Sequence, residues 1–306
     1  MNLKIEERLP IEYKGFLFRK SNNALILNSD DYNGAIQIMK KDSINNLEIN
    51  SNFFKENHLD FLRKFDFIEG LTIISSIIKD ISPIQILTNL KTLNIEHKLK
   101  GELDFQSFKN LQECSFVWGI RGSETIFDTL SLLKLRIDNY DKYEIIEISN
   151  LKKLHSLSLY YATIINLQGI SRLKNLTKLD LTGCVYLEDI EKINELTSLR
   201  ELRLDDCKNL TTLKPVNNLQ KLQHLSFNNI GSLSSIVYLN SLSNLEEIFF
   251  SDNTNIKDGN LNNLEYLFQK AKLKKAIFKN RRHYTHKPQD LGFEVPDVVA
   301  NIFRKK

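Results

Sequence analysis

Two cysteines stand at equivalent places in a phrase that the sequence repeats. Cys184 and Cys207 close the phrases "LDLTGC" and "LRLDDC", one repeat apart. No Cys-x-x-Cys motif and no neighbouring histidine accompanies them, so they indicate neither a metal site nor a nucleophile. Cys114 stands where other copies of the repeat have a leucine, and it is expected to be buried, because free cysteine packs as a small hydrophobe. Three cysteines in 306 residues make no disulfide framework, and a reducing cytoplasmic location is expected.

The remaining candidates for chemistry are few. His283 and His286 have a spacing that could bring two imidazoles together on a helix, but no third ligand is evident nearby. Surface or cap histidines are therefore favoured over a metal site. The 11 glycines are scattered, no phosphate-binding "GxxxxGK" occurs, and no Ser/His/Asp arrangement stands out. The sequence predicts no enzyme, no cofactor and no metal.

Composition and charge narrow the class of protein. Hydrophobic residues make up 42% of the chain and charged residues 26%, which is ordinary for a soluble globular protein. The beginning of the chain shows no signal-peptide-like apolar core, and no window reaches the roughly 18 consecutive apolar residues of a membrane helix. The formal net charge of +4 is too small to imply a nucleic-acid partner.

The segments that contain these cysteines belong to a pattern that repeats along the chain. An apolar residue, a spacer and a second apolar residue return at nearly even steps, and only the last step is markedly longer. Because successive side chains of a strand alternate, each pair predicts a short strand with its apolar side in the core. The pairs are Leu47/Ile49, Leu71/Ile73, Leu93/Ile95, Cys114/Phe116, Leu135/Ile137, Leu157/Leu159, Leu179/Leu181, Leu202/Leu204, Leu225/Phe227, Ile248/Phe250 and, more weakly, Ala276/Phe278.

Between these strands the apolar residues recur at every third position. One example runs from Ile164 through Leu167, Ile170 and Leu173 to Leu176. An α-helix repeats about every 3.6 residues, so a strict period of three would move the apolar side around its surface. The period suits 3₁₀ or polyproline-II turns, in which every third residue is aligned.

The repeated core "LxxLxL" appears as "LTNLKTLNI", "LKKLHSLSL", "LKNLTKLDL", "LTSLRELRL" and "LQKLQHLSF". Over about residues 41–280 the chain resembles the leucine-rich repeat family, in its short, about 22-residue, internalin-like bacterial class. The resemblance implies an α/β-type solenoid: a horseshoe of about 11 coils with a parallel concave β-sheet, mostly 3₁₀ or polyproline-II convex returns, and a cap at each end.

The same resemblance gives Cys184 and Cys207 a structural role. They occupy the family's asparagine position, whose side chain satisfies backbone groups where the strand ends, and a thiol can partly do this. Their separation of one strand spacing is compatible with a disulfide, but buried free thiols are favoured.

Three regions are expected along the chain. Residues 1–40 form a β-rich N-terminal cap with a short helix near "GAIQIMKKDS", residues 41–280 form the solenoid, and residues 281–306 form a C-terminal cap and tail. Helical spacing also appears in "LNNLEYLFQKA". No linker rich in Pro, Gly or Ser divides the chain, so one solenoid domain is expected.

The candidate recognition surface consists of the spacer residues and the residues that follow each strand, because these side chains face outward. Trp, Tyr and Arg are enriched at binding hot spots. The predicted protein-binding residues are Trp118, Arg136, Asp138, Tyr160, Tyr161, Asp180, Arg203, Asp205, Asp206 and Phe249. Trp118 lies in the most degenerate coil and could instead fill the core. The aspartates of the C-terminal half, together with Asp252, would suit a basic partner.

Positive charge collects near the end of the chain, between Lys270 and Lys287. A possible anion-binding site there comprises Lys275, Lys279, Arg281 and Arg282. A solvated cap face is favoured, because an end coil must be polar outside and little aromatic interleaving supports base stacking.

The predicted function is a non-catalytic, monomeric module that binds another protein on its concave strand face. One alternative is a bacterial immunity or regulatory protein that blocks one toxin or enzyme, since the Lys, Asn and Ile richness is typical of low-GC bacterial coding. An alternative of another class is nucleic-acid or anion binding through the basic C-terminal face. Nucleic acid is the less favoured partner, and no membrane contact is expected.

Overall fold

The computed structural model describes residues 9–291, and the chain divides into two compact units. Unit 1 is Met1–Asp138 and unit 2 is Asn139–Lys306. The division falls inside the predicted solenoid, at a place where the sequence shows no linker. Part of each predicted cap, residues 1–8 and 292–306, lies outside the described residues. Within the described part of the chain, no helix combines the length and the hydrophobicity needed to cross a bilayer.

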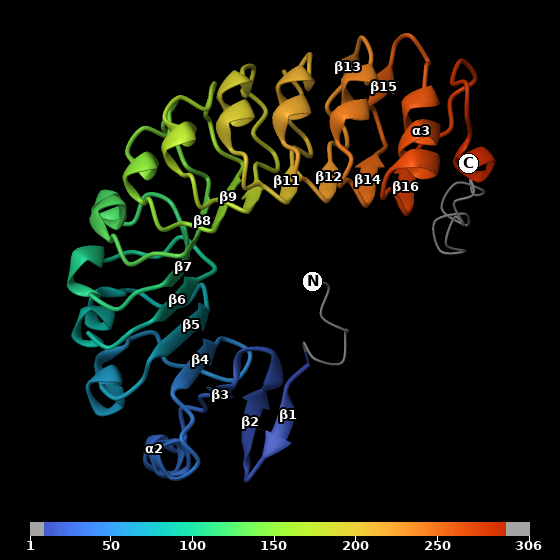
Figure 1. Ribbon diagram of the computed structural model, residues 1–306. Helices are drawn as coiled ribbons and strands as arrows, with labels where there is room; N and C mark the ends of the chain where they lie inside the picture. Colours follow the sequence, from blue (N-terminus) through green and yellow to red (C-terminus); the bar gives the residue numbers. More distant parts are fainter. Residues whose placement is uncertain (1–8, 292–306) are drawn as a thin grey trace. The chain divides into compact units, whose positions relative to one another are not determined.

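Unit 1 begins with an antiparallel hairpin and continues as parallel strands. Strand β2 pairs antiparallel with β1 and with β3, and from β3 onward each strand pairs in parallel with the next. Figure 1 shows these strands in sequence order. Their bounds are β1 (Ile11–Tyr13), β2 (Phe16–Arg19), β3 (Ala24–Ile26), β4 (Asn46–Asn50), β5 (Gly70–Ile74), β6 (Thr92–Ile95), β7 (Glu113–Val117) and β8 (Lys134–Asp138).

Helix α2 (Tyr32–Lys41) connects β3 to β4 where the sequence predicts a short helix. Asp31 caps its first turn by accepting a hydrogen bond from the backbone N–H of Gly34 at 2.7 Å. Ala35 and Met39, which lie on one side of the helix, are fully buried. The predicted β-rich start of the chain thus contains three strands and one helix over the residues described.

From β4 onward the segments that connect the strands of unit 1 contain 3₁₀ turns, as the period of three predicts. They place Phe65, Ile84, Phe105 and Ile126 in the core. The 3₁₀ turns of unit 1 are η1 (Lys20–Asn22), η2 (Asp60–Phe65), η3 (Ser82–Ile86), η4 (Phe105–Ser107) and η5 (Ser123–Asp128).

Unit 2 continues the parallel pattern with shorter strands. Leu179 lies beside Leu157 on one side and Leu202 on the other, and the same register continues through Leu225 and Ile248. The strands are β9 (Ser156–Tyr160), β10 (Lys178–Asp180), β11 (Glu201–Arg203), β12 (His224–Ser226), β14 (Glu247–Phe250) and β16 (Lys275–Phe278), while β13 (Ser232–Leu233) and β15 (Asn255–Ile256) form a separate two-stranded sheet.

The returns of unit 2 are also 3₁₀ turns, except before the last strand. There the longer last step of the repeat accommodates helix α3 (Asn262–Lys270), which matches the predicted helical spacing. The turns are η6 (Ile148–Asn150), η7 (Ile170–Arg172), η8 (Glu191–Glu195), η9 (Lys214–Asn218), η10 (Val237–Ser241) and η11 (Pro288–Leu291). The predicted architecture of parallel strands joined by mostly non-α returns is confirmed.

All three cysteines are buried and free, as predicted. The Cys184 Sγ donates to the carbonyl of Leu159 at 3.4 Å, and the Cys207 Sγ donates to the carbonyl of Leu181 at 3.0 Å. Each thiol thus bonds to the backbone of the preceding coil, which is the role expected from the asparagine position. Burial raises the pKa of the Cys114 thiol, so it stays protonated.

Candidate functional site

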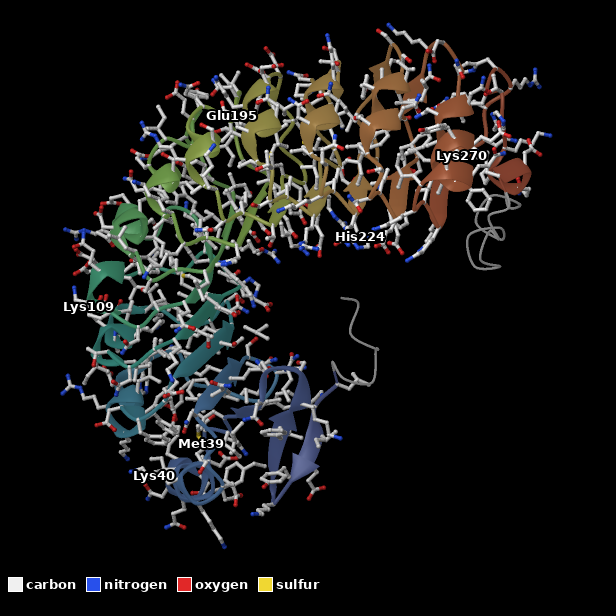
Figure 2. The ribbon with its side chains drawn as sticks, viewed as in Figure 1. Met39, Lys40, Lys109, Glu195, His224 and Lys270 are labelled. Carbon is white, nitrogen blue, oxygen red and sulfur yellow. The ribbon has the colours of Figure 1, made fainter. Side chains whose placement is uncertain are left out.

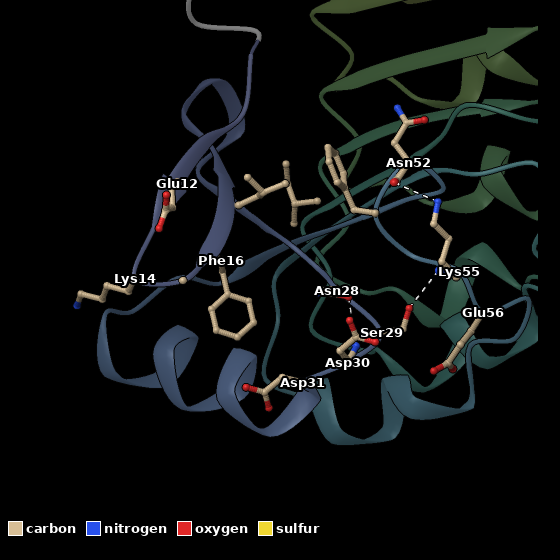
Figure 3. Close-up of a pocket in the computed structure, with 14 residues that line it drawn as sticks. Glu12, Lys14, Phe16, Asn28, Ser29, Asp30, Asp31, Asn52, Lys55 and Glu56 are labelled. Carbon is tan, nitrogen blue, oxygen red and sulfur yellow. Dashed lines mark hydrogen bonds between the residues drawn. The ribbon is translucent and has the colours of Figure 1, made fainter.

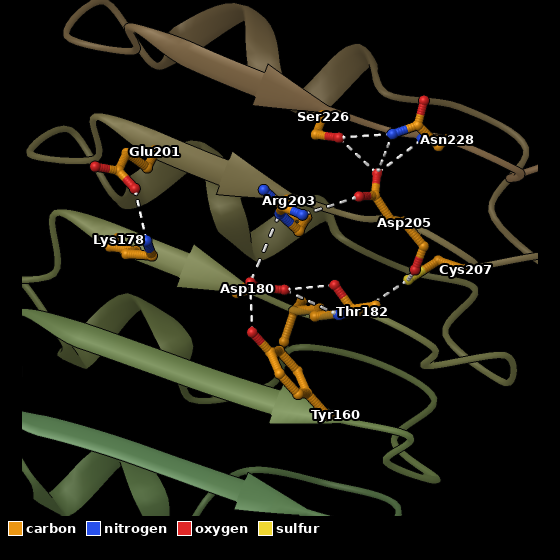
Figure 4. Close-up of polar contacts among 11 residues, drawn as sticks. Tyr160, Lys178, Asp180, Thr182, Glu201, Arg203, Asp205, Cys207, Ser226 and Asn228 are labelled. Atoms are coloured by element: carbon orange, nitrogen blue, oxygen red, sulfur yellow. Dashed lines mark hydrogen bonds and ion pairs between the residues drawn. The ribbon is translucent and has the colours of Figure 1, made fainter. Parts of the chain in front are cut away.

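The strand face of unit 2 carries a continuous network of hydrogen bonds and ion pairs between β9 and β12 (Figure 4). Its first centre is Asp180, on β10. Asp180 Oδ2 accepts a hydrogen bond from the Tyr160 hydroxyl at 3.0 Å, and Asp180 Oδ1 accepts one from the Thr182 hydroxyl at 2.6 Å. Arg203 Nε, on the next strand, lies 3.7 Å from Asp180 Oδ2. This carboxylate therefore ties together three consecutive strands.

The second centre of the network is Asp205, which closely follows strand β11. Asp205 Oδ1 accepts hydrogen bonds from the Ser226 hydroxyl at 2.6 Å and from the backbone N–H and side-chain amide of Asn228 at 2.8 and 3.1 Å. Asp205 Oδ2 lies 3.5 Å from Arg203 Nη1. The Asn228 side-chain carbonyl oxygen then accepts from the Ser251 hydroxyl at 2.9 Å, which extends the chain of contacts to the end of β14.

These contacts change the expected character of the face. The sequence predicts exposed carboxylates, yet Asp180 is 5% exposed and Asp205 is 9% exposed, because neighbouring strands supply partners that cover them. The predicted exposure of these two side chains is wrong. Arg203, whose side chain is 56% exposed, lies between the two acids and offsets part of their charge. Buried carboxylates that accept several hydrogen bonds hold a fixed geometry.

Further polar contacts line the start of the strands. Lys178 Nζ forms an ion pair with Glu201 Oε2 at 2.8 Å, and Lys274 Nζ forms one with Glu246 Oε2 at 2.8 Å. His224 Nδ1 lies 3.3 Å from Glu247 Oε2. Burial acts to raise the pKa of Glu201, but the hydrogen bond and charge of Lys178 outweigh it and lower that pKa. Figure 2 shows His224 on the strand side of unit 2, opposite the 3₁₀ side.

The aromatic residues of this face differ in their surroundings. Tyr160 is half-buried and is held through its hydroxyl, whereas Tyr161 is 65% exposed. Phe249 on β14 lies beside Ile277 on β16, and Lys275 Nζ lies 4.9 Å from the centre of its ring. The predicted residues Tyr160, Asp180, Arg203 and Asp205 are therefore brought together, with aromatic side chains near both ends of the network.

Asp206 lies in the turn after β11. It is half-buried, and its Oδ1 accepts a hydrogen bond from the Asn229 side-chain amide at 2.5 Å. The Asn229 side-chain carbonyl oxygen in turn accepts from Asn253 at 2.8 Å. A second polar row thus runs along the turns beside the strand face. Asp252, one turn further on than Asn229, is exposed.

The predicted residues of unit 1 form a different environment. Arg136 donates two hydrogen bonds to Asp138 on the same strand, both at 2.8 Å, so their charges offset each other. Trp118 is only 8% exposed and stacks on Phe127 with ring centres 5.7 Å apart. Of the two placements that the sequence leaves open for Trp118, an exposed binding residue or a core residue, the structure shows the core, because aromatic side chains of this degenerate coil pack against it.

Several structural partners were not predicted from the sequence. Thr182, Ser226 and Asn228 complete the network of unit 2, although their small polar types look like ordinary surface. In unit 1, Glu48 is fully buried and forms two hydrogen bonds with Arg19, at 2.5 and 2.7 Å. The only signal for the first group is its position beside an acidic residue of the same or the preceding coil.

The basic residues near the end of the chain are partly used within the fold. Arg281 donates to the carbonyls of Asp252 and Thr254 at 3.1 and 2.9 Å, and Lys275 covers Phe249. Lys279 and Arg282 are exposed. The basic face is therefore smaller than the sequence suggests.

The two histidines considered for a metal site take different partners. His283 Nε2 lies 2.9 Å from the carbonyl of Ile256, and His286 Nε2 lies 3.4 Å from Glu265 Oε2. Between residues 9 and 291, no group of three or more His, Cys, Asp or Glu side chains is arranged to hold a metal ion.

Unit 1 also contains an open groove near its start (Figure 3). Its lining combines apolar side chains with several acidic ones. Some of its polar groups have partners within the fold: Asp31 caps α2, and Lys55 Nζ donates to the carbonyls of Ser51 and Asn52 at 3.0 and 3.1 Å. The lining residues are Glu12, Lys14, Gly15, Phe16, Leu17, Ile26, Asn28, Ser29, Asp30, Asp31, Asn52, Phe53, Lys55 and Glu56.

Comparisons with known proteins support the repeat. A family model for the leucine-rich repeat domain of the endo-β-N-acetylglucosaminidase EndoS matches residues 154–253, which lie within unit 2 and include the network. No protein of the curated set matches the chain.

Two internalins are among the solved structures to which this chain is similar. An internalin, inlF, from Listeria monocytogenes aligns with a TM-score of 0.56 and 18% identity, covering 86% of this chain and 84% of that one. An internalin C2 from the same species aligns with a TM-score of 0.49 and 22% identity, covering 60% of this chain and 81% of that one. The alignment with inlF confirms the predicted leucine-rich repeat fold in its internalin-like form.

Proposed function

We propose that this chain, a leucine-rich repeat protein by its fold, is a non-catalytic module that binds another protein through the strand face of unit 2. The observation that carries the proposal is the network from Tyr160 to Ser251, which fixes polar side chains across five neighbouring strands. A surface already held in place loses less conformational freedom when a partner binds.

The composition of the face supports the same proposal. Arg203 is exposed between two anchored carboxylates, and aromatic side chains lie near the ends of the network. Aromatic residues and arginine dominate the energy of many protein interfaces. The internalin-like fold is compatible with such a role, although fold alone does not identify a partner.

Site-specific photocrosslinking tests the proposal. A benzoylphenylalanine replaces Phe249 on the strand face or, as the control, Glu195 on the 3₁₀ side, where Figure 2 places it. We expect a discrete adduct in cells from position 249 and none from position 195. The adduct is identified by mass spectrometry, and the purified partner is then titrated with the unmodified chain.

A variant of the network refines that titration. Arg203→Ala should weaken binding of the identified partner by at least about tenfold, as expected for a central hot-spot residue. Lys192→Ala, on turn η8 of the same unit, is the matched control and should bind normally. Equal crosslinking at positions 195 and 249, or normal binding by Arg203→Ala, contradicts the proposed face.

A further inference from the structure

Tyr161 occupies a turn position at which its counterparts share an uncommon backbone conformation. Tyr161 has φ of 55°, and Gly183, Asp206, Asn229 and Asp252 have φ of 76°, 60°, 54° and 55°. Backbone hydrogen bonds place the first of these residues in register, since Tyr161 N–H donates to Thr182 O and Gly183 N–H donates to Asp205 O.

Tyrosine is the exception in this row. Left-handed backbone suits Gly, Asn and Asp, whereas a bulky side chain is disfavoured there. The other coils of unit 2 therefore show what the turn itself requires, and a tyrosine is not part of it. Tyr161 is also 65% exposed, so burial in the core does not explain its presence.

The neighbouring glycine accommodates the ring of Tyr161. A Cβ added to Gly183 would lie 2.6 Å from Tyr161 Cδ1 and 2.9 Å from Cε1, so any side chain there would have to displace the ring. Gly183 thus leaves space for the ring to lie against the next turn, with most of its surface open to solvent.

Carboxylates lie on the turns and strands that follow Tyr161, beyond Gly183. Asp206 follows Gly183 in the row of turns, and Asp180 and Asp205 lie on the adjoining strand face. Arg203 pairs with both Asp180 and Asp205 and so offsets only part of this charge. An exposed aromatic ring attracts a cation, acids on the following coils favour the approach of positive charge, and a planar guanidinium can both stack on a ring and bond to a carboxylate.

We propose that Tyr161, supported by Gly183, receives an arginine side chain of the protein partner, whose guanidinium reaches across Gly183 toward Asp206 on the following turn. This inference rests on the proposed function, because it names the chemistry that the partner presents to one edge of the same face.

A small-molecule titration tests the arginine site on the full chain. N-acetylarginine methylamide is added to protein with ¹³C-labelled tyrosine rings, and the citrulline analogue serves as the neutral control. We expect the Tyr161 signal, identified by its loss in Tyr161→Asn, to shift at least about threefold more with the arginine compound. Tyr186, 55% exposed on the next coil, should not shift. No shift, or an equal shift with citrulline, overturns the inference.

Gly183→Asn provides a second test that keeps the turn favourable. Asparagine tolerates the left-handed conformation, but its Cβ would occupy the space of the Tyr161 ring. We expect an unchanged circular dichroism spectrum and a loss of the arginine response. A folded Gly183→Asn protein that retains the full response contradicts the role of the ring.

The two proposals can fail separately. If crosslinking at Phe249 identifies a partner that Tyr161→Asn binds normally, the arginine site is wrong and the proposed face remains. If the arginine response is present but no adduct forms at Phe249, the function assigned to the strand face is wrong instead.

Discussion

Trp118 and Tyr161 stand at the same place in their coils, just after a strand ends, yet they have opposite environments. Trp118 in unit 1 is 8% exposed and packs on Phe127, whereas Tyr161 in unit 2 is 65% exposed. In unit 1 the left-handed turn falls one residue later, on Gly119, with φ of 94°. In unit 2 it falls on the tyrosine itself. The backbone of the turn, and not the aromatic character of the residue, decides which ring enters the core.

The largest expected effect concerns the ring that is turned inward. Trp118→Ala should lower the free energy of unfolding by about 3–5 kcal/mol, because it removes a large core side chain and leaves a cavity. Tyr161→Ala should cost no more than about 1 kcal/mol, since its ring is mostly in water already. Urea unfolding followed by circular dichroism measures both. Equal losses would remove the distinction between the two positions.

The second prediction concerns the glycine beneath the exposed ring. Gly183→Ala should lower the free energy of unfolding by about 1–2 kcal/mol from its left-handed backbone, plus the cost of displacing Tyr161. Gly231→Ala is the matched control, because φ is 85° there and a Cβ would meet nothing closer than 3.7 Å. Thermal unfolding should rank Gly183→Ala below Gly231→Ala. Identical melting temperatures would mean that displacing the Tyr161 ring costs no stability.

The third prediction concerns the exposed ring itself. Tyr161→Asn should raise the free energy of unfolding by up to about 1 kcal/mol, because asparagine suits the left-handed backbone better than tyrosine. Tyr186→Asn, whose backbone has no positive φ, should bring no gain. Urea unfolding of the two variants checks this. A clear loss of stability in Tyr161→Asn would show that tyrosine serves the fold rather than a partner.

The smallest expected effect concerns the charges on the strand face of unit 2. Burial opposes the ionisation of Glu201, yet Lys178 lowers the pKa of this carboxyl below the usual 4.5. The stabilisation is therefore present above pH 4.5 and is lost as the pH falls through the lowered pKa. Glu201→Gln should cost at most about 0.5 kcal/mol at neutral pH and less at about pH 3. Melting temperatures at the two pH values test it, with Glu124→Gln on turn η5 as an exposed control.

Much of the fold could be predicted because the same apolar spacing recurs in nearly every coil. The leucines of β9 to β12 align through a nearly constant step, and the period of three excludes a continuous helix in the returns. The buried thiols of Cys184 and Cys207 follow from the same alignment. Less of the candidate site could be predicted. The sequence predicts its residues from their positions within and just after each strand, but the burial of Asp180 and Asp205 depends on partners from neighbouring coils.

In the predicted anion-binding site, too, contacts with a neighbouring coil could not be predicted from the sequence. Arg281 looks available in the sequence, yet its guanidinium bonds to two backbone carbonyls of the preceding coil. The cytoplasmic location, the monomeric state and the immunity or regulatory role stay predictions of the sequence.

The sequence by itself determined the repeating unit of one strand and one turn, because each repeat has the same apolar spacing and the side chains of each strand alternate. Only the tertiary structure decided which outward positions are open to a partner. Two partners of Asp180 lie one coil away in the sequence but one strand away in space. Trp118 and Tyr161 differ in whether the left-handed turn residue is the next residue or the aromatic residue itself. Such contacts depend on stacking and backbone conformation, which the identity of one residue does not specify.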